Sequence, residues 1–453
     1  MTSRAFLTAF LAVLPFAIAT AQDWSELATL SFTPIVSDRP VAAGTSGSTT
    51  SPAVSASAED DRAPAQVIAR IEAAVSAIDS EKLENGEYSP ALLPLYRTLA
   101  GIYLEIDGYG DAIDVLEQAQ QVVRRHQGLY SLDQAGLIEE MIDIDLAVTP
   151  NEESLEREDV LRELVERNPG DPRNAGILTR MAGRQQDVAD YVLIHGVEPE
   201  LTLNVSMNGL NPGRSSPPTA RSIAGSMLRQ ARASYGYAMR AALYDGQAEL
   251  SQLFELEDSI IDTYYFELMN PQLRRGWGPS RGQGAGSLYA GATNTLEAKL
   301  SNIRRFSGSP EAITRALIEI ADWDLMFRRF GHAMKGYQDA LDYLRAESGD
   351  EQRVAAIFSP EAPVPLPALA SNANVYDGKG NVHGFFDVEI EINRFGGVRD
   401  IVVTGRSENA TDAIERRLRR FVYLSRFRPR YVNGEWRRTD RFALRYDFGY
   451  TSS

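Results

Sequence analysis

Hydrophobic positions follow two different periods along the chain. Between about residues 65 and 350 they recur mostly every three to four residues, as on one face of a helix. Over roughly the last 70 residues they alternate with polar positions instead, and Phe386, Val388, Ile390 and Ile392 fall two apart. The pattern predicts an α+β multidomain chain, in which a long helical region is followed by a small sheet domain.

Turn signals divide the C-terminal segment into strands. Gly396-Gly397 follows the alternating strand and favours a tight hairpin turn into a second strand at residues 398–404. Asn433-Gly434, the strongest short-range hairpin signal, precedes a final alternating strand.

A short amphipathic helix is predicted between the second strand and the final one. Asn409 or Thr411 provides its N-cap, and its apolar residues recur at i, i+4 and i+7 as Ile414, Leu418 and Phe421. The predicted order is therefore β-β-α-β, an antiparallel sheet with one face covered by the helix.

This segment resembles the C-terminal domain of TonB-type energy transducers over residues 380–448, about one sixth of the chain. The resembling residues are 386–393, 397–403, Ser407, the run Arg426-Phe427-Arg428-Pro429, and Asn433-Gly434. In that family the last strand pairs with an extended peptide at the plug of an outer-membrane transporter and passes on force from a proton-driven motor. Main-chain pairing of this kind gives affinity without demanding a fixed sequence.

The resemblance implies that residues 442–448 form an exposed edge strand. The residues nearest a partner would then be Leu444, Arg445, Tyr446 and Asp447. A second candidate contact is the basic face of the predicted helix, where Arg416 and Arg420 stand with Arg417 and Arg419. That face either contacts an acidic partner or lipid headgroups, or is simply solvated.

The helical region carries the offsets of a repeated helical hairpin. Its first copy places Tyr96, Leu99, Ala100 and Tyr103 on one helix and Ala112, Leu116 and Ala119 on the next. A weaker copy runs through Ala321, Phe330, Ala333, Tyr337 and Ala340. These sets resemble the tetratricopeptide repeat (TPR), and we expect them to be repeat core rather than ligand contacts. Degenerate TPR-like hairpins are predicted to fill residues 65–200 and 223–357.

Irregular segments separate these regions. Residues 22–64 are rich in Ser, Thr and Pro and are predicted to be a disordered linker. Loops are expected at 201–222, which contains three prolines, and at the Gly-rich stretch 274–286. A Pro-rich connector, 358–371, leads into the TonB-like domain at 372–453.

The N-terminus has the layout of a secretory signal peptide. Arg4 precedes a short apolar run, and Ala19-Thr20-Ala21 is a small-x-small cleavage motif, so residues 1–21 are expected to be removed before Gln22. The alternative is an uncleaved segment that anchors the chain in the inner membrane. The first interpretation predicts a periplasmic protein, and the absence of cysteine excludes disulfide and thiol chemistry.

Charge is distributed unevenly between the two regions. Residues 372–453 hold 15 Lys and Arg against 11 Asp and Glu, whereas the remainder holds 31 against 51, within a total of −16. An acidic body argues against nucleic acid, whose binding requires a basic stripe. Separate protein partners for the acidic region and the basic domain fit this asymmetry.

Candidate catalytic chemistry is sparse. The four histidines, His126, His195, His332 and His383, lie about 50 or more residues apart, so we expect no metal site. The Gly-rich stretch lacks the Gly-Lys-Ser/Thr of a phosphate loop, and no Gly-x-Ser-x-Gly occurs. We therefore expect neither a cofactor nor an enzymatic activity.

Two functions are favoured, and a third, an enzyme of unknown type, is disfavoured because no catalytic constellation is visible in the sequence. The first is a periplasmic adaptor whose TPR-like repeats hold one partner while its TonB-like domain docks an extended strand of another, in outer-membrane transport through TonB-dependent receptors or elsewhere in the envelope. The second is a true TonB-type energy transducer with an uncleaved N-terminal anchor. The family's Pro-rich spacer is replaced here by about 300 residues of helical repeats.

Overall fold

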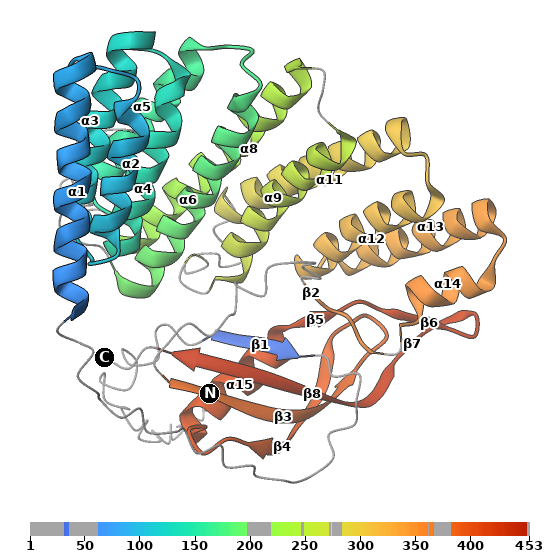
Figure 1. Ribbon diagram of the computed structural model, residues 1–453. Coiled ribbons are helices and arrows are strands. Elements are labelled where there is room, and N and C mark those ends of the chain that lie inside the picture. The colour runs from blue at the N-terminus through green and yellow to red at the C-terminus, as the bar shows by residue number, and fades with distance from the viewer. Residues whose placement is uncertain are drawn as a thin grey trace, which may run out of the picture.

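The computed structural model describes residues 31–35, 62–196, 219–245, 249–270, 273, 283–360, 362–366 and 382–450. The predicted signal peptide, 1–21, lies outside these residues, as does most of the predicted linker and of the two predicted loops. Helices form an arc over a small sheet domain, and the ends of the described chain meet in that sheet (Figure 1). The α+β class expected from the sequence is confirmed.

Consecutive helices of the arc pack as antiparallel hairpins (Figure 1). Capping defines several of their ends: Asn151 and Ser154 form a capping box at α5, and Ser309 caps α12 with Pro310 following at its first turn. The helices are α1 (Arg62–Asn85), α2 (Leu92–Leu104), α3 (Tyr109–Gln127), α4 (Ala135–Val148), α5 (Glu152–Arg167), α6 (Arg173–His195), α8 (Ala220–Asp245), α9 (Leu250–Met269), α11 (Gln283–Phe306), α12 (Pro310–Met326), α13 (Phe330–Ser348) and α14 (Glu351–Phe358).

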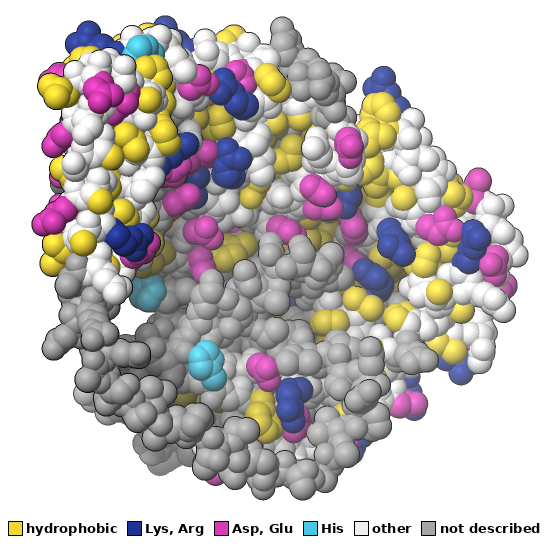
Figure 2. Space-filling view, in the orientation of Figure 1, with side chains coloured by type: hydrophobic (Ala, Val, Ile, Leu, Met, Phe, Trp, Pro, Cys, Tyr) yellow, Lys and Arg dark blue, Asp and Glu magenta, His cyan; other side chains and the backbone are white. Residues whose placement is uncertain are grey.

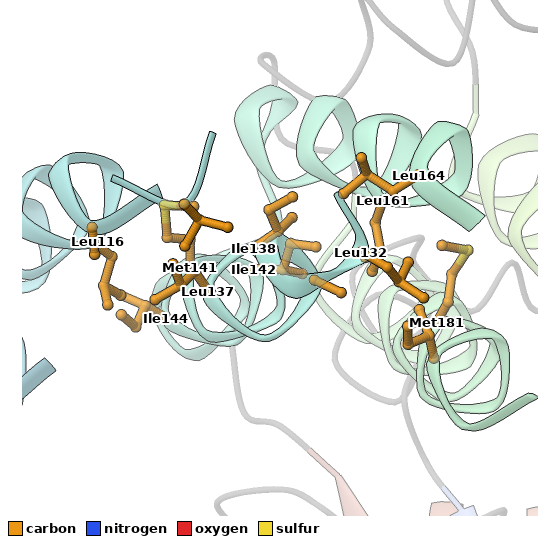
Figure 3. Packing of buried hydrophobic residues seen from close by; sticks show 14 of the residues in the cluster. Leu116, Leu132, Leu137, Ile138, Met141, Ile142, Ile144, Leu161, Leu164 and Met181 are labelled. Atoms are coloured by element: carbon orange, nitrogen blue, oxygen red, sulfur yellow. The ribbon is translucent and has the colours of Figure 1, made fainter. Parts of the chain in front are cut away.

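One hydrophobic core runs through several successive hairpins. Figure 3 shows Leu116 of α3, Ile142 of α4, Leu161 of α5 and Met181 of α6 along this core, and all four are at most 2% exposed. The same cluster continues to Ile260 of α9. Each hairpin therefore buries its apolar faces against its neighbours, as a stacked array of helices requires.

The residues predicted to be repeat core are largely buried. Small side chains at the helix contacts allow close approach: in α13, a Cβ added at Gly336 would lie 3.0 Å from the Cβ of Ala321 in α12. Buried members of the two sets are Tyr96, Leu99, Ala100, Ala112, Leu116, Ala119, Ala321, Ala333, Tyr337 and Ala340. Phe330 is the exception, since it begins α13 and is 40% exposed, and Tyr103 is only partly buried.

The sheet domain has the strand order β1-β8-β3-β4, and every neighbouring pair is antiparallel. Its strands are β1 (Ser31–Ile35), β3 (Val382–Ile392), β4 (Val398–Arg406) and β8 (Thr439–Tyr450), and helix α15 (Asp412–Leu424) lies between β4 and β8 in sequence. Short pairs join β2 (Pro365–Leu366) to β5 (Arg426–Phe427) and β6 (Arg430–Val432) to β7 (Glu435–Arg437).

Helix α15 covers one face of the sheet and closes a second core. The four alternating residues of β3, from Phe386 to Ile392, are at most 3% exposed and face it, as predicted. Thr411 supplies the N-cap, accepting a hydrogen bond from the Ile414 amide. The helix face was misplaced by one position: Val422 is fully buried, whereas Phe421 is only partly buried, with its ring edge-on to Tyr446.

Several predicted boundaries are wrong in detail. Strand β1 and the start of α1 fall inside the segment predicted to be a disordered linker. Likewise, α8 begins inside the predicted loop 201–222, α11 begins inside the predicted Gly-rich loop, and β2 lies in the predicted connector. The Asn433-Gly434 turn has positive φ at both residues, as expected, but it closes the extra hairpin β6–β7 before the final strand.

Truncating the core of the sheet domain tests this packing. Phe386→Ala removes a fully buried ring that packs against Phe448 and should lower the free energy of unfolding by about 3–5 kcal/mol. Phe421→Ala, on the partly buried side of α15, should cost clearly less. Hydrogen exchange of the β3 and β8 amides measures both, and equal protection losses in the two variants would contradict the assigned helix face.

Candidate functional site

Strand β8, predicted to be a free edge, is an inner strand of the sheet. Its inner side pairs with β3 from Thr439 to Tyr450, and its outer side pairs with β1. Ser31 lies opposite Gly449, and the pairing ends with Ile35 opposite Arg445. The expectation of an exposed edge at Arg445, Tyr446 and Asp447 is therefore wrong, because the chain's own strand occupies it (Figure 1). Leu444 lies one residue beyond this pairing.

The side chains of the four candidate residues, 444–447, alternate between the two faces of the sheet. Leu444 and Tyr446 are buried in the core under α15, so only their main-chain groups are available to a neighbouring strand. Burial raises the pKa of Tyr446. Arg445 and Asp447 are on the opposite face, because side chains alternate along a strand.

Arg445 is held in place from within the sheet. Its Nε donates to Asp387 Oδ1 at 2.8 Å and its Nη2 to Asp387 Oδ2 at 3.1 Å, and its guanidinium lies over the ring of Phe385. This bidentate pairing raises the pKa of Arg445. Burial raises the pKa of Asp447, and the Arg445 charge opposes that effect. Arg445 therefore stiffens the β3–β8 pair rather than reaching outward.

The opposite edge of the sheet, β4, is closed by side chains. The Ile401 amide donates to Asp400 Oδ1 at 3.0 Å, and the Ile401 carbonyl accepts from Arg419 Nη1 at 2.9 Å. Arg419 is itself fixed by Glu415 at 2.8 Å. Since the N–H and C=O of one strand residue point the same way, this arrangement blocks the middle of β4 against an incoming strand.

The four arginines of α15 separate into different roles. Arg419 seals the β4 edge, and burial lowers the pKa of Arg417. Arg416 and Arg420 lie one turn apart and are exposed. Arg419 is exposed too but is engaged at the β4 edge, which leaves Arg416 and Arg420 as the exposed candidates for a partner contact.

A buried ion pair, which the sequence did not reveal, fastens the sheet domain to the helices. Arg428 Nε donates to Asp322 Oδ1 of α12 at 3.1 Å and Nη2 to Oδ2 at 2.5 Å. The Tyr337 hydroxyl of α13 also donates to Asp322 Oδ1, at 2.6 Å. Asp322 therefore accepts hydrogen bonds from the helices, through Tyr337, and from the sheet domain, through Arg428. The only sign of this ion pair in the sequence is Asp322 itself, an aspartate on the apolar face of the α12–α13 hairpin.

Aromatic packing surrounds this ion pair. Trp436 Nε1 donates to Gln338 Oε1 at 3.0 Å, and its ring contacts those of Tyr337, Phe358 and Tyr431. Leu366, Tyr431 and Trp436 pack into the same apolar cluster as α12, α13 and α14. The sheet domain therefore covers the apolar surface at the end of the helical array.

Two polar clusters lie inside the helical array. Between α9, α11 and α12, Lys299 Nζ donates to Asp258 and Glu319, and burial raises the pKa of nearby Asp262 to about 7, with Asp258 adding to the shift. Between α5 and α6, Arg184 Nε donates to Glu158 Oε1 at 2.6 Å beside a cavity of about 40 Å³. That cavity has room for a water molecule or two.

The described residues contain no group of three His, Asp or Glu side chains placed to hold a metal ion. None of the described helices is long and apolar enough to cross a membrane. On the face drawn in Figure 2, acidic and basic side chains are interspersed over the helices rather than gathered by sign.

Comparison of the sequence with models of known protein families gives no match, and comparison with curated proteins gives none either.

The interdomain ion pair can be tested by removing its cation. Arg428→Met leaves Asp322 buried without a counter-charge and should cost about 3–5 kcal/mol. Hydrogen exchange should rise in α12 and in β6–β7, while Arg437→Met, at an exposed arginine, should change little. Asp322→Asn added to Arg428→Met should recover part of the loss; no recovery would show that the pair does not couple the two domains.

Asp262 should make stability depend on pH. Its folded-state pKa of about 7 lies above its ordinary 3.8, so stability falls as the pH rises between those values and is level above about 7. Asp262→Asn should remove this slope and stabilise the protein at pH 8 by on the order of 1–3 kcal/mol. Urea unfolding of both proteins from pH 4 to pH 8 measures the difference, and parallel curves would contradict the assignment.

Proposed function

We propose that this protein is a non-enzymatic periplasmic adaptor, in which a TPR-like helical array holds one partner and a TonB-like C-terminal domain docks an extended strand of another envelope protein. The observation that carries the proposal is the outer edge of β8. It binds a five-residue strand that lies about 410 residues away in the sequence, and it does so by main-chain pairing. An edge that takes up a sequence-distant strand has the property required for strand addition.

The choice of β8 over β4 has a physical basis. The middle of β4 is blocked by Asp400 and Arg419, whereas the outer side of β8 is paired only from Arg445 to Gly449 among the described residues. Its remaining stretch, from Thr439 to Leu444, has no described strand against it. Among the described residues, this stretch of β8 is the part of its outer side that a partner strand can join.

Support for the TonB-like character comes from the resembling residues. The sheet has the expected strand and helix order, and Arg428 of the Arg-Phe-Arg-Pro run forms the buried contact to α12. Support for the TPR-like character comes from the buried small residues of the α2–α3 and α12–α13 hairpins. The proposed compartment rests on the signal motif at residues 1–21, and the proposed partners include outer-membrane TonB-dependent receptors.

Site-specific photo-crosslinking in cells tests the docking strand. A photoreactive amino acid at Ala443, an exposed position of β8 beyond the β1 pairing, should give an adduct with an envelope protein. The same group at Tyr423, exposed on α15, is the matched control and should not give that adduct. Equal labelling from both positions, or none from Ala443, would contradict docking at β8.

Removal or retention of residues 1–21 distinguishes a periplasmic adaptor from a membrane-anchored transducer. Mass spectrometry should find a chain that begins at or near Gln22 in the periplasmic fraction. An intact Met1 in the membrane fraction would instead favour the energy-transducer alternative.

A further inference from the structure

The strand that closes β8 is a weak occupant of that site. It spans only the five residues from Ser31 to Ile35, against twelve in β8. Pro34, opposite Tyr446, has no N–H, and only alternate residues of an outer strand point their N–H toward the neighbouring strand, so β1 donates at most three main-chain hydrogen bonds to β8. Proline in a sheet is confined largely to edge strands and the ends of strands, which fits β1 as the outermost strand.

The site extends beyond this occupant. In the stretch 439–444 of β8, Thr439 and residues 442–444 pair with β3 on one side, with an irregularity between them, and no described strand lies on the other side. No described element competes for this stretch, so an incoming strand can form its first main-chain hydrogen bonds there without disturbing β1. Extending the pairing toward Gly449 then replaces β1 one residue at a time, so that no large set of hydrogen bonds is broken before others form.

We propose that β1 is a built-in competitor for the strand-binding site of β8, and that a partner strand pairs first with residues 439–444 and then displaces Ser31–Ile35. This inference rests on the proposed docking function and adds its regulation: the chain masks its own site, and only a strand that pairs longer or better than β1 gains access.

The sheet sets the chemistry of that partner strand. Cross-strand neighbours share a face, so partner positions opposite Phe442, Leu444, Tyr446 and Phe448 lie on the α15 side, where these residues join the apolar core. Positions opposite Ala443, Arg445 and Asp447 lie on the charged side. The partner is an extended segment of about ten residues, free of proline, that alternates apolar and polar side chains and runs antiparallel to β8.

Elements other than β1 supply a continuous core for the sheet domain. Its described members come from β3, β4, α15, β5 and β8, from Phe386 to Phe448. Helix α15 and the Arg428–Asp322 contact hold these elements together from the other sides. In the proposal, release of β1 leaves these elements folded with a free strand edge.

A reversible crosslink tests the competition directly. The chain has no native cysteine, and Thr33 lies opposite Asp447, at the spacing of directly paired antiparallel residues. Thr33→Cys/Asp447→Cys should form a disulfide that locks β1 onto β8. The oxidised and reduced forms carry the same substitutions, so a difference in binding between them comes from the disulfide alone.

The probe is a fluorescent peptide with the sequence of residues 29–38 of this chain, carrying valine in place of Pro34, and binding is measured by fluorescence anisotropy. Deletion of residues 31–35 should strengthen binding at least tenfold over the unaltered protein, because the tethered strand competes at an effective concentration on the order of millimolar. The oxidised variant should bind at least tenfold more weakly than its reduced form, because only residues 439–444 remain open to the peptide, and reduction should restore the unaltered level. A peptide with proline at alternate positions, which cannot pair, is the matched negative control.

Several outcomes would overturn the proposal. Equal binding by oxidised and reduced protein would place the peptide elsewhere. A deletion variant that ignores the peptide would show that β8 does not accept strands in trans, and one that fails to fold would show that β1 is structural. The photoreactive group at Ala443, which β1 does not cover, separates the two ideas: adducts at Ala443 together with equal peptide binding by locked and reduced protein leave the adaptor function standing and refute displacement, whereas the loss of adducts in locked and reduced forms alike refutes the adaptor function.

Discussion

The outer strands of a sheet carry main-chain donors and acceptors that must be satisfied, and the C-terminal domain depends on how that requirement is met. On β4 the solution is local: Asp400 and Arg419 bind the outward N–H and C=O of Ile401. On β8 the solution is another strand, drawn from the opposite end of the described chain. The first closure is specific to its side chains. The closure of β8 uses main-chain groups that every extended chain possesses, so another strand can take the place of β1.

The helical array has a related boundary problem, since a stack of hairpins leaves an apolar face at each end. At the end formed by α12, α13 and α14, that face is covered by Leu366, Tyr431 and Trp436 of the sheet domain. The Asp322–Arg428 pair lies in the same interface, where both charges are largely removed from water. The sheet domain is thus the cap of the array as well as a separate structural unit, and its orientation relative to the helices is fixed.

Local patterns were enough to predict the class of each region and several of its elements, but not the long-range contacts between them. Alternation in β3, the positive-φ turn at Asn433-Gly434 and the small residues of the α2–α3 hairpin act over a few residues, so they are visible in the sequence. Strand β1 is not, because five residues that include Pro34 carry no period of their own. Its conformation comes from pairing with β8, just as the burial of Asp322 comes from Arg428, and neither partner is near in sequence.

The pairing of β1 with β8 also fixes an order of assembly. About 410 residues separate Ile35 from Arg445, so at ordinary rates of synthesis β1 is made roughly 20–80 s before the strand it joins. The hairpins of the array form from local contacts and can complete before that contact exists, whereas a contact of such high sequence separation forms late. The first described element of the chain to be synthesised is therefore among the last to reach its native position. Strand β1 joins β8 only after the helical array and the rest of the sheet have folded.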